Sequence, residues 1–163
     1  MPRLATVDDA DDVARLLHDF NTEFDWPSPG PGVLADRLRV LLPGEETFAI
    51  VAGVAGAPPV ALALVTLRPN VWYDGRVALL DELYVVPELR SRGIGSRVVD
   101  LLMSIARERD VDLIEINVDE GDVDAQRFYE RHGFTGIEPE TGERAFYYQQ
   151  ELKRGETSIP LGE

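Results

Sequence analysis

One stretch, from Leu79 to Ile105, constrains the fold of this chain more than any other part of it. An apolar run ends at Pro87, which lacks the N–H that a strand ladder requires, so a strand must end there. A short basic loop with Gly93 and Gly95 follows, and apolar residues then recur at helical spacing as far as Ile105. The sequence therefore predicts a buried strand, a glycine loop and a helix in direct succession.

The other apolar patterns predict further strands and helices before and after this unit. Their order is β-α-α-β-β-β-α-β-α-β, which corresponds to a mixed-sheet α/β (α+β) fold with helices on both faces of one sheet. The length of 163 residues predicts one domain, over residues 1–152, followed by a polar tail over 153–163. We expect strands near 3–7, 48–52, 60–65, 77–86, 113–118 and 146–148, and helices near 13–20, 33–41, 94–105 and 125–132.

Composition excludes several classes of function. Sixteen basic and thirty acidic residues leave a net charge of -14, which argues against nucleic-acid binding because phosphate contacts need clustered Lys and Arg. An acidic surface suits a small cationic partner, although solubility explains the charge equally well. The absence of cysteine excludes disulfides and thiolate zinc sites, and two histidines are too few for a His-rich metal site. With no signal peptide visible and no apolar run of roughly 18 residues, we expect a cytoplasmic protein without membrane contact.

The loop before the predicted third helix is suited to a phosphate. The first turn of a helix has N–H groups without partners at its positive end, and glycines let a pyrophosphate approach the backbone closely. Arg90 and Arg92 stand where basic residues oppose the helix dipole, so an anionic ligand explains them better than structure does. A Walker loop is excluded because Gly-Lys-Ser/Thr is missing, and a dinucleotide fingerprint would need glycine at Val98. An ordinary tight turn remains the alternative for the two glycines.

Two motifs make a family resemblance specific. Arg-x-x-Gly-x-Gly, starting at Arg90 after a strand that ends in Leu83-Tyr84-Val85, resembles the acyl-CoA signature of the GCN5-related N-acetyltransferase (GNAT) superfamily. The run 122–134, with Ala, Phe-Tyr and Gly-Phe at the family's spacings, resembles its second motif. The resemblance implies the acyl-CoA N-acyltransferase fold with splayed central strands, acetyl-CoA as co-substrate without a metal, and N-acetyltransferase activity.

The resemblance also assigns roles to individual residues. Tyr129 matches the general acid that protonates the CoA thiolate, although it could instead pack on the apolar helix face beside Phe128. A strand amide near Val85 would stabilise the oxyanion, an effect often worth roughly 3 kcal/mol. Asp122 stands where Asn is common, which puts its contact with the cofactor arm in doubt. The implied cofactor-binding residues are Leu83, Tyr84, Val85, Arg90, Ser91, Arg92, Gly93, Ile94, Gly95, Ser96, Asp122 and Tyr129.

Two adjacent acids, Asp81 and Glu82, interrupt the apolar strand before the loop. Neighbouring strand residues point to opposite faces, and a buried carboxylate without a partner is costly, so both residues need an explanation. The chain resembles diamine acetyltransferases here, which implies that Asp81 is the base or amine-binding residue, with Glu82 as second choice. A salt bridge at the strand end is the alternative for either.

Aromatic residues near carboxylates indicate a cationic acceptor. Trp26 and Trp72 lie in loop-like sequence, next to Asp25 and near Asp74, and suit an amine through ring faces and charge. We expect a small-molecule amine: a polyamine, an aminoglycoside-like compound or an amino-acid derivative. A protein or peptide acetyltransferase and a non-catalytic acyl-CoA sensor remain alternatives. Homodimers are common in the family, and residues 146–148 could serve either an interface or the core.

Overall fold

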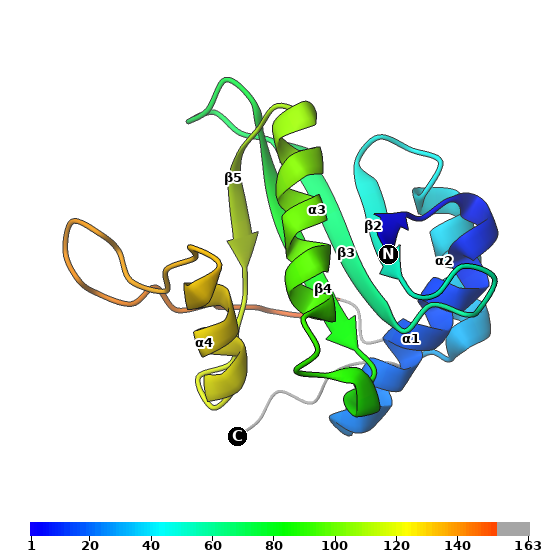
Figure 1. The fold of residues 1–163 in the computed structure, drawn as a ribbon. Coiled ribbons are helices and arrows are strands. Elements are labelled where there is room, and N and C mark those ends of the chain that lie inside the picture. The colour runs from blue at the N-terminus through cyan, green and yellow to red at the C-terminus, as the bar shows by residue number, and fades with distance from the viewer. Residues whose placement is uncertain (153–163) are drawn as a thin grey trace.

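A computed structural model describes residues 1–152 of the chain, and the expected polar tail lies outside the described residues. Its centre is a five-stranded mixed sheet in the order β1-β2-β3-β4-β5 (Figure 1). The first four strands are antiparallel neighbours, whereas β5 runs parallel to β4. The strands are β1 (Pro2–Leu4), β2 (Thr47–Ala52), β3 (Ala61–Pro69), β4 (Arg76–Val85) and β5 (Val111–Ile116).

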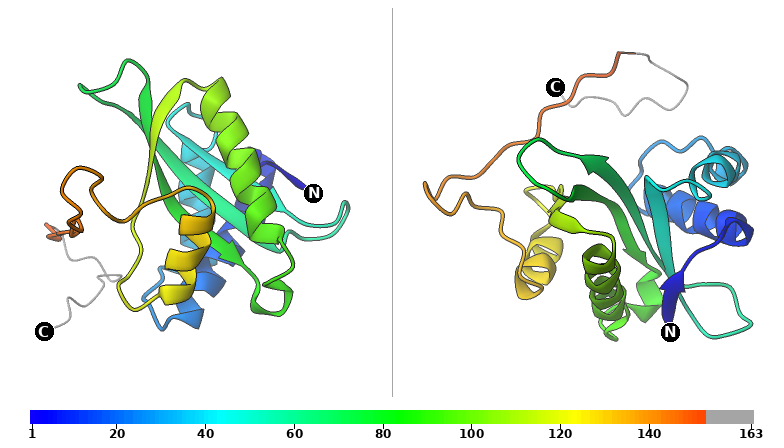
Figure 2. Two further views of the ribbon diagram at one scale, coloured as in Figure 1. Left: turned by 60° about the vertical axis from the view of Figure 1, so that its left-hand side comes forward. Right: turned by 90° about the horizontal axis from the view of Figure 1, so that it is seen from above.

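Four helices cover the two faces of the sheet. Seen from above, α1 (Ala10–Glu23) and α2 (Pro31–Leu41) lie on one side, and α3 (Ile94–Glu108) and α4 (Val123–Arg131) on the other (Figure 2). Each face has its own apolar cluster, which is the expected result when strands alternate their side chains between two helical layers. The mixed α/β architecture predicted from periodicity is thereby confirmed. Within the described part of the chain, none of the helices combines the length and hydropathy that a membrane span requires.

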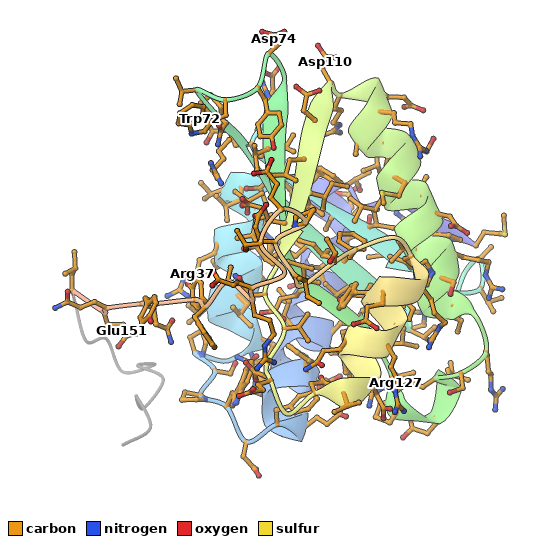
Figure 3. The ribbon with its side chains drawn as sticks, turned by 90° about the vertical axis from the view of Figure 1, so that its left-hand side faces the viewer. Arg37, Trp72, Asp74, Asp110, Arg127 and Glu151 are labelled. Carbon is orange, nitrogen blue, oxygen red and sulfur yellow. The ribbon has the colours of Figure 1, made fainter. Side chains whose placement is uncertain are left out.

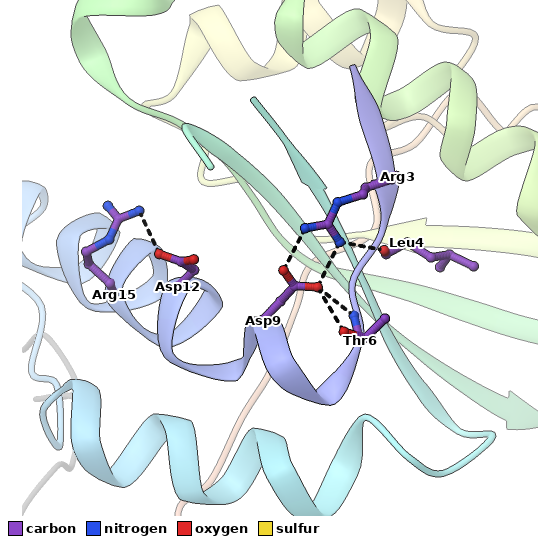
Figure 4. A network of polar contacts seen from close by, with 6 residues as sticks. All are labelled: Arg3, Leu4, Thr6, Asp9, Asp12 and Arg15. Atoms are coloured by element: carbon purple, nitrogen blue, oxygen red, sulfur yellow. Dashed lines mark hydrogen bonds and ion pairs between the residues drawn. The ribbon is translucent and has the colours of Figure 1, made fainter. Parts of the chain in front are cut away.

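A polar network fixes the entry to α1. The Thr6 N–H donates to Asp9 Oδ2 at 2.8 Å, and the Arg3 guanidinium binds the same carboxylate at 2.8 and 2.7 Å (Figure 4). This turn begins at Thr6, so β1 ends at Leu4 rather than extending to residue 7. The hydrogen bond from Arg3 is the largest reason why the pKa of Asp9 falls to about 2.

The predicted last strand is not formed in the described residues. Residues 145–150 pair with no strand, and the side chains of Phe146, Tyr147 and Tyr148 are 70, 67 and 87% exposed. An isolated bridge joins Ile137 to Arg144, after which the chain runs away from the sheet (Figure 2, right). The prediction of a strand at 146–148 is therefore wrong for this structure, because an apolar, β-prone segment forms a strand only where a partner strand is within reach.

An irregularity in β4 shapes the centre of the sheet. Opposite β3, Leu80 pairs with Val65 but Glu82 pairs with Leu64, so Asp81 is an extra residue. Pairing between β4 and β5 ends at Leu80, opposite Ile116. Beyond this β-bulge, β4 continues to Val85 beside β3 alone. The splayed central strands that the resemblance implied are confirmed.

The Arg3–Asp9 network gives a stability prediction. Asp9→Asn should lower the free energy of unfolding at pH 7 by about 1 kcal/mol, since it weakens a capping interaction and a partly exposed ion pair. Because the pKa of Asp9 lies below its ordinary 3.8, this stabilisation is complete above that pH and is lost as the pH falls through about 2. Urea unfolding measures the difference, with the exposed neighbour variant Asp8→Asn as control. An equal loss in both variants would contradict the assignment.

Candidate active site

Beyond the bulge, one edge of β4 has no neighbouring strand in the described part of the chain, because its pairing with β5 ends at Leu80; we call this unpaired edge the opening. The Val86 N–H donates to the Val60 carbonyl at 3.0 Å on the β3 side. Backbone direction alternates along an antiparallel ladder, so Leu83 and Val85 direct their N–H and C=O groups toward the opening. The Val85 carbonyl indeed accepts a bond from Arg90 Nε at 2.9 Å on that side. The edge of β4 therefore offers the N–H groups of Leu83 and Val85 to a ligand.

The bulge also changes which side chains face which helices. After it, Leu83 and Val85 pack in the cluster beneath α3 and α4, whereas Tyr84 is buried beneath α1. The Tyr84 ring lies 5.6 Å from that of Phe20. By the same backbone alternation, Tyr84 directs its N–H and C=O toward β3. Leu83, Tyr84 and Val85 are the strand residues predicted to bind the cofactor. Of the three, Tyr84 is thus the one whose backbone N–H and C=O face β3 and not the opening.

The glycine loop leads from β4 into α3. Gly93 has φ +75° and caps the helix in the left-handed region, where glycine is unstrained, and Ser91 shares that region at φ +60°. The first bond in the helix runs from the Arg97 N–H to the Gly93 carbonyl at 3.2 Å. The N–H groups of Ile94, Gly95 and Ser96 therefore have no helical partner. This is the array of free donors that the sequence predicted for an anion.

Gly95 has a second purpose that the motif did not indicate. A Cβ on Gly95 would lie 3.4 Å from Phe128 Cζ and 3.8 Å from Val85 Cγ2. The start of α3 is thus in direct contact with α4 and with the end of β4. Glycine at this position lets three elements that bear predicted site residues approach one another closely.

Arg90 is not a free charge at the loop. Its two terminal nitrogens bind the carboxylate of Glu23, at the end of α1, at 2.7 and 2.6 Å. Its guanidinium also lies 5.6 Å from the centre of the Tyr84 ring. Arg92 and Arg97 are exposed, and neither forms an ion pair within residues 1–152. The positive charge available to a phosphate therefore comes from Arg92 and Arg97, while Arg90 connects α1 to the end of β4.

The two acids of β4 differ in environment. Asp81 is exposed and accepts a hydrogen bond from Thr66 Oγ1 at 2.6 Å. Desolvation raises the pKa of Asp81, and the bond from Thr66 opposes the rise. Glu82 is half-buried, and burial, with a smaller contribution from the charge of Asp81, raises the pKa of Glu82 to about 7. Near neutral pH, Glu82 is therefore the carboxyl that can both take up and release a proton.

Tyr129 lies on α4 and is buried, with its ring in edge contact with Phe128 and Phe134 at 5.2 and 5.6 Å. Burial raises the pKa of Tyr129 above its ordinary value, and the charges of Glu82 and Asp122 raise it further. The hydroxyl has no hydrogen-bond partner among the described residues. Every fully buried side-chain oxygen there has a partner, so the Tyr129 hydroxyl must be accessible to solvent. Tyr129 thus combines a packed ring with a protonated, solvent-accessible hydroxyl.

Three other predicted site residues have different positions. Asp122 caps α4, with Oδ1 accepting the Ala125 N–H at 2.9 Å, so this oxygen is already bound. Trp26 follows α1 and lies about 6 Å from Phe20, ring to ring. Trp72, which is 84% exposed, lies at the tip of the β3–β4 hairpin (Figure 3). That tip precedes β4, whereas the glycine loop follows it, so a strand of about 30 Å separates them. The structure does not bring Trp72 to this site.

The arrangement can be compared with known proteins. Residues 11–134 match the model of the acetyltransferase (GNAT) family. Thialysine N-epsilon-acetyltransferase of Bos taurus is 25% identical over 163 residues, covering 94% of this chain and 95% of that protein.

Two solved structures are similar over nearly the whole fold. One is a protein of Arthrobacter sp. FB24 assigned as an acetyltransferase, with 51% identity, a TM-score of 0.86, and coverage of 93% of this chain and 96% of that one. The other is an aminoglycoside acetyltransferase from an uncultured soil metagenomic sample, in complex with sisomicin, with 17% identity, a TM-score of 0.75, and coverage of 94 and 96%. The splayed strands, the free donors of α3 and the family match together establish that this chain is an N-acetyltransferase of the GNAT family, which uses an acyl-CoA donor.

Proposed function

We propose that this enzyme transfers the acetyl group of acetyl-CoA to the primary amine of a small cationic acceptor, by direct attack in a ternary complex. The observation that carries the proposal is the opening beyond Leu80 and Ile116, where β4 and β5 part. Free strand donors, the start of α3, a carboxyl with a pKa of about 7 and a buried tyrosine all adjoin it.

The start of α3 fits an anionic diphosphate. The N–H groups of Ile94, Gly95 and Ser96 are free of helical partners, and the helix dipole is positive there. Arg92 and Arg97 add charge in a protein whose net charge is -14. A nucleotide held there would extend its acyl arm along the free edge of β4. The donor supplies an activated thioester, and the N–H of Val85 or Leu83 would stabilise negative charge on its carbonyl oxygen.

Glu82 is our choice for the general base. An alkyl ammonium has a pKa near 10.4 and cannot attack until it loses a proton. A base with a pKa near the operating pH is best matched to accept that proton, and the pKa of Glu82 is about 7. The ammonium proton passes first to Glu82, directly or through water. The amine nitrogen then forms a bond to the thioester carbon, the C–S bond breaks, and the second proton on nitrogen leaves to solvent. Asp81, which accepts a hydrogen bond from Thr66, would attract the ammonium.

Tyr129 would act on the leaving group, the CoA thiolate, as a proton donor. Its raised pKa keeps the hydroxyl protonated at neutral pH, so it can donate to the sulfur as the C–S bond breaks. A thiol has an ordinary pKa near 8.5, below that of a phenol, so the donation acts mainly by stabilising the thiolate as it forms. In this proposal Glu82 acts on the attacking amine and Tyr129 on the leaving thiolate.

The acceptor class follows from charge and from the relatives. Glu82, Asp81 and the aromatic ring of Trp26 suit a cation, and the bovine relative is named for thialysine, an amino-acid derivative. The metagenomic enzyme was crystallised with sisomicin, an aminoglycoside. We therefore place lysine-like amino acids, polyamines and aminoglycosides first in a panel assayed by CoA release. Turnover with peptides alone would favour the protein acetyltransferase, and tight acetyl-CoA binding without any turnover would favour the sensor.

The role of Tyr129 can be tested by removing its hydroxyl. Tyr129→Phe should lower kcat by about 10²-fold or more, because the thiolate loses its proton donor, while the packed ring is kept. The Kd for acetyl-CoA, measured by calorimetry, should stay within about twofold. Tyr73→Phe, at the hairpin tip, is the matched control and should leave kcat unchanged. Unchanged turnover in Tyr129→Phe would remove this residue from the mechanism.

The choice between the two acids can be made from a pH profile. A base must be deprotonated to act, so kcat/KM should rise with pH through about 7 in the wild-type enzyme. Glu82→Gln should lower kcat/KM by about 10²-fold and abolish that rise. Asp81→Asn, whose amide oxygen can still accept the Thr66 bond, should keep it. The reverse pattern would assign the base to Asp81.

A further inference from the structure

An ion pair connects the end of α1 to the end of β4, two elements that are distant in the sequence. Glu23 is the last residue of α1, and Arg90 follows the short turn Pro87–Leu89 after β4. Both terminal nitrogens of the Arg90 guanidinium donate to the Glu23 carboxylate, at 2.7 and 2.6 Å. Such two-point contacts between an arginine and a carboxylate fix orientation as well as distance. The end of α1 is therefore held beside the turn after β4 (Figure 1).

The third nitrogen of Arg90 extends this contact to the opening. Arg90 Nε donates to the Val85 carbonyl at 2.9 Å, and the N–H of the same peptide group, on Val86, donates to the Val60 carbonyl at 3.0 Å. The peptide group after Val85 is thus held by Arg90 on one side and by β3 on the other. The direction of the Val85 N–H depends on the backbone angles of Val85, so this restraint limits how that N–H can move.

The two charges of the ion pair are used inside the protein. An acid near Trp26 could otherwise bind an ammonium, but both oxygens of the Glu23 carboxylate already accept a bond from Arg90. The Arg90 guanidinium is bound to Glu23 and to Val85, and it lies over the Tyr84 ring, so its charge is not free for a phosphate. The pair therefore acts on the backbone of β4 and not on a ligand.

The loop that carries Trp26 has its own anchors on α1. The Trp26 N–H donates to the Asn21 carbonyl at 2.8 Å, and Asn21 Nδ2 donates to the Pro27 carbonyl at 2.9 Å. The rings of Phe20 and Trp26 lie 6.0 Å apart. None of these contacts involves the ion pair. Removing the ion pair should therefore disturb the backbone of β4 and leave this loop, and with it the candidate acceptor residue, in place.

We propose that Glu23 is a positioning residue which, acting through Arg90, fixes the peptide group after Val85 so that the Val85 N–H is aimed at the thioester carbonyl oxygen. The inference rests on the proposed function, and it narrows the choice of oxyanion donor from Leu83 or Val85 to Val85. A donor aimed at the oxyanion acts mainly in the transition state. The ion pair therefore affects kcat rather than the binding of either substrate.

Steady-state kinetics of Glu23→Gln and Arg90→Lys test the inference, because each variant keeps a side chain of similar length but breaks the two-point contact. In both, kcat should fall by about tenfold or more, since a small displacement of an oxyanion donor has a large effect on rate. The KM for the amine, and the Kd for acetyl-CoA measured by calorimetry, should stay within about twofold. The double variant should have the kcat of Arg90→Lys alone, because Glu23 acts only through Arg90.

Asp11→Asn is the matched control. Asp11 also lies on α1, and both of its carboxylate oxygens are 2.8 Å from Arg39 Nη2, but this ion pair is at the opposite end of the helix. Its loss should leave kcat unchanged. An equal fall of kcat in Asp11→Asn would mean that any ion pair of α1 has this effect, and it would overturn the assignment to Glu23.

A second measurement does not depend on turnover. The carbonyl-carbon NMR signal of Val85 in the free protein should shift in Glu23→Gln and in Arg90→Lys, and it should stay in place in Asp11→Asn. An unshifted signal would overturn the inference even if the enzyme acetylated no amine. A shifted signal in a protein that acetylates no amine would instead reject the proposed function, while Glu23 would remain the residue that fixes this peptide group.

Three kinetic results would also contradict the inference. An unchanged kcat in Glu23→Gln would remove this residue from the reaction, and a raised KM for the amine at constant kcat would make it an acceptor-binding residue. A Kd for acetyl-CoA raised about tenfold in Arg90→Lys would assign Arg90 to the phosphates. Additive losses of kcat in the double variant would mean that Glu23 does not act through Arg90.

Discussion

The extra residue at Asp81 is the constraint on which the rest of the site depends. Its insertion moves the pairing of β4 against β3 by one position, and at the same point β4 loses contact with β5. A regular ladder would have used every N–H and C=O of β4 inside the sheet and left nothing for a ligand. The bulge also changes which residues of β4 face which helical layer, so that Leu83 and Val85 pack beneath α3. Asp81 and Glu82 lie at the point where β4 and β5 part. β-bulges often occur beside active sites for this reason.

Burial and nearby charges give the polar groups of the site different pKa values. A hydroxyl hydrogen bond holds Asp81, whereas Glu82, one residue further, has a pKa of about 7 because burial penalises its ionised form. Burial is the main reason why the pKa of Tyr129 is raised and the hydroxyl stays protonated, and the charge of Glu82 adds to the effect. Two titratable groups whose environments separate their affinities for a proton are the usual basis for assigning acid and base roles.

Most of the fold could be predicted from sequence because it rests on local signals. Apolar periodicity and Pro87 located the strands and helices to within a few residues, and the glycines of the loop marked the start of α3. Two successive acids, Asp81 and Glu82, interrupt the apolar pattern of the strand, and the structure has its bulge at this position. An acid directly before a helix, as Asp122 is, also indicates a helix cap, and Asp122 caps α4.

Contacts between residues distant in sequence could not be predicted. Arg90 binds Glu23, 67 residues away, and no local pattern connects the two. Trp26 and Trp72 share one sequence signal, a loop with acids nearby, but the topology places Trp72 at the end of β4 opposite to the glycine loop. Residues 146–148 have strong strand propensity, but propensity does not say whether a partner strand lies within reach.

The contact between Gly95 and Phe128 has a consequence for how this enzyme can vary. Tyr129 directly follows Phe128 in α4. The position of the Tyr129 hydroxyl therefore depends on how closely α4 packs against the first turn of α3. A Cβ at position 95 would lie in van der Waals contact with the Phe128 ring, at 3.4 Å. In the proposed mechanism, the packing of α4 on the first turn of α3 therefore affects both the turn that would bind the nucleotide and the tyrosine that would donate the proton.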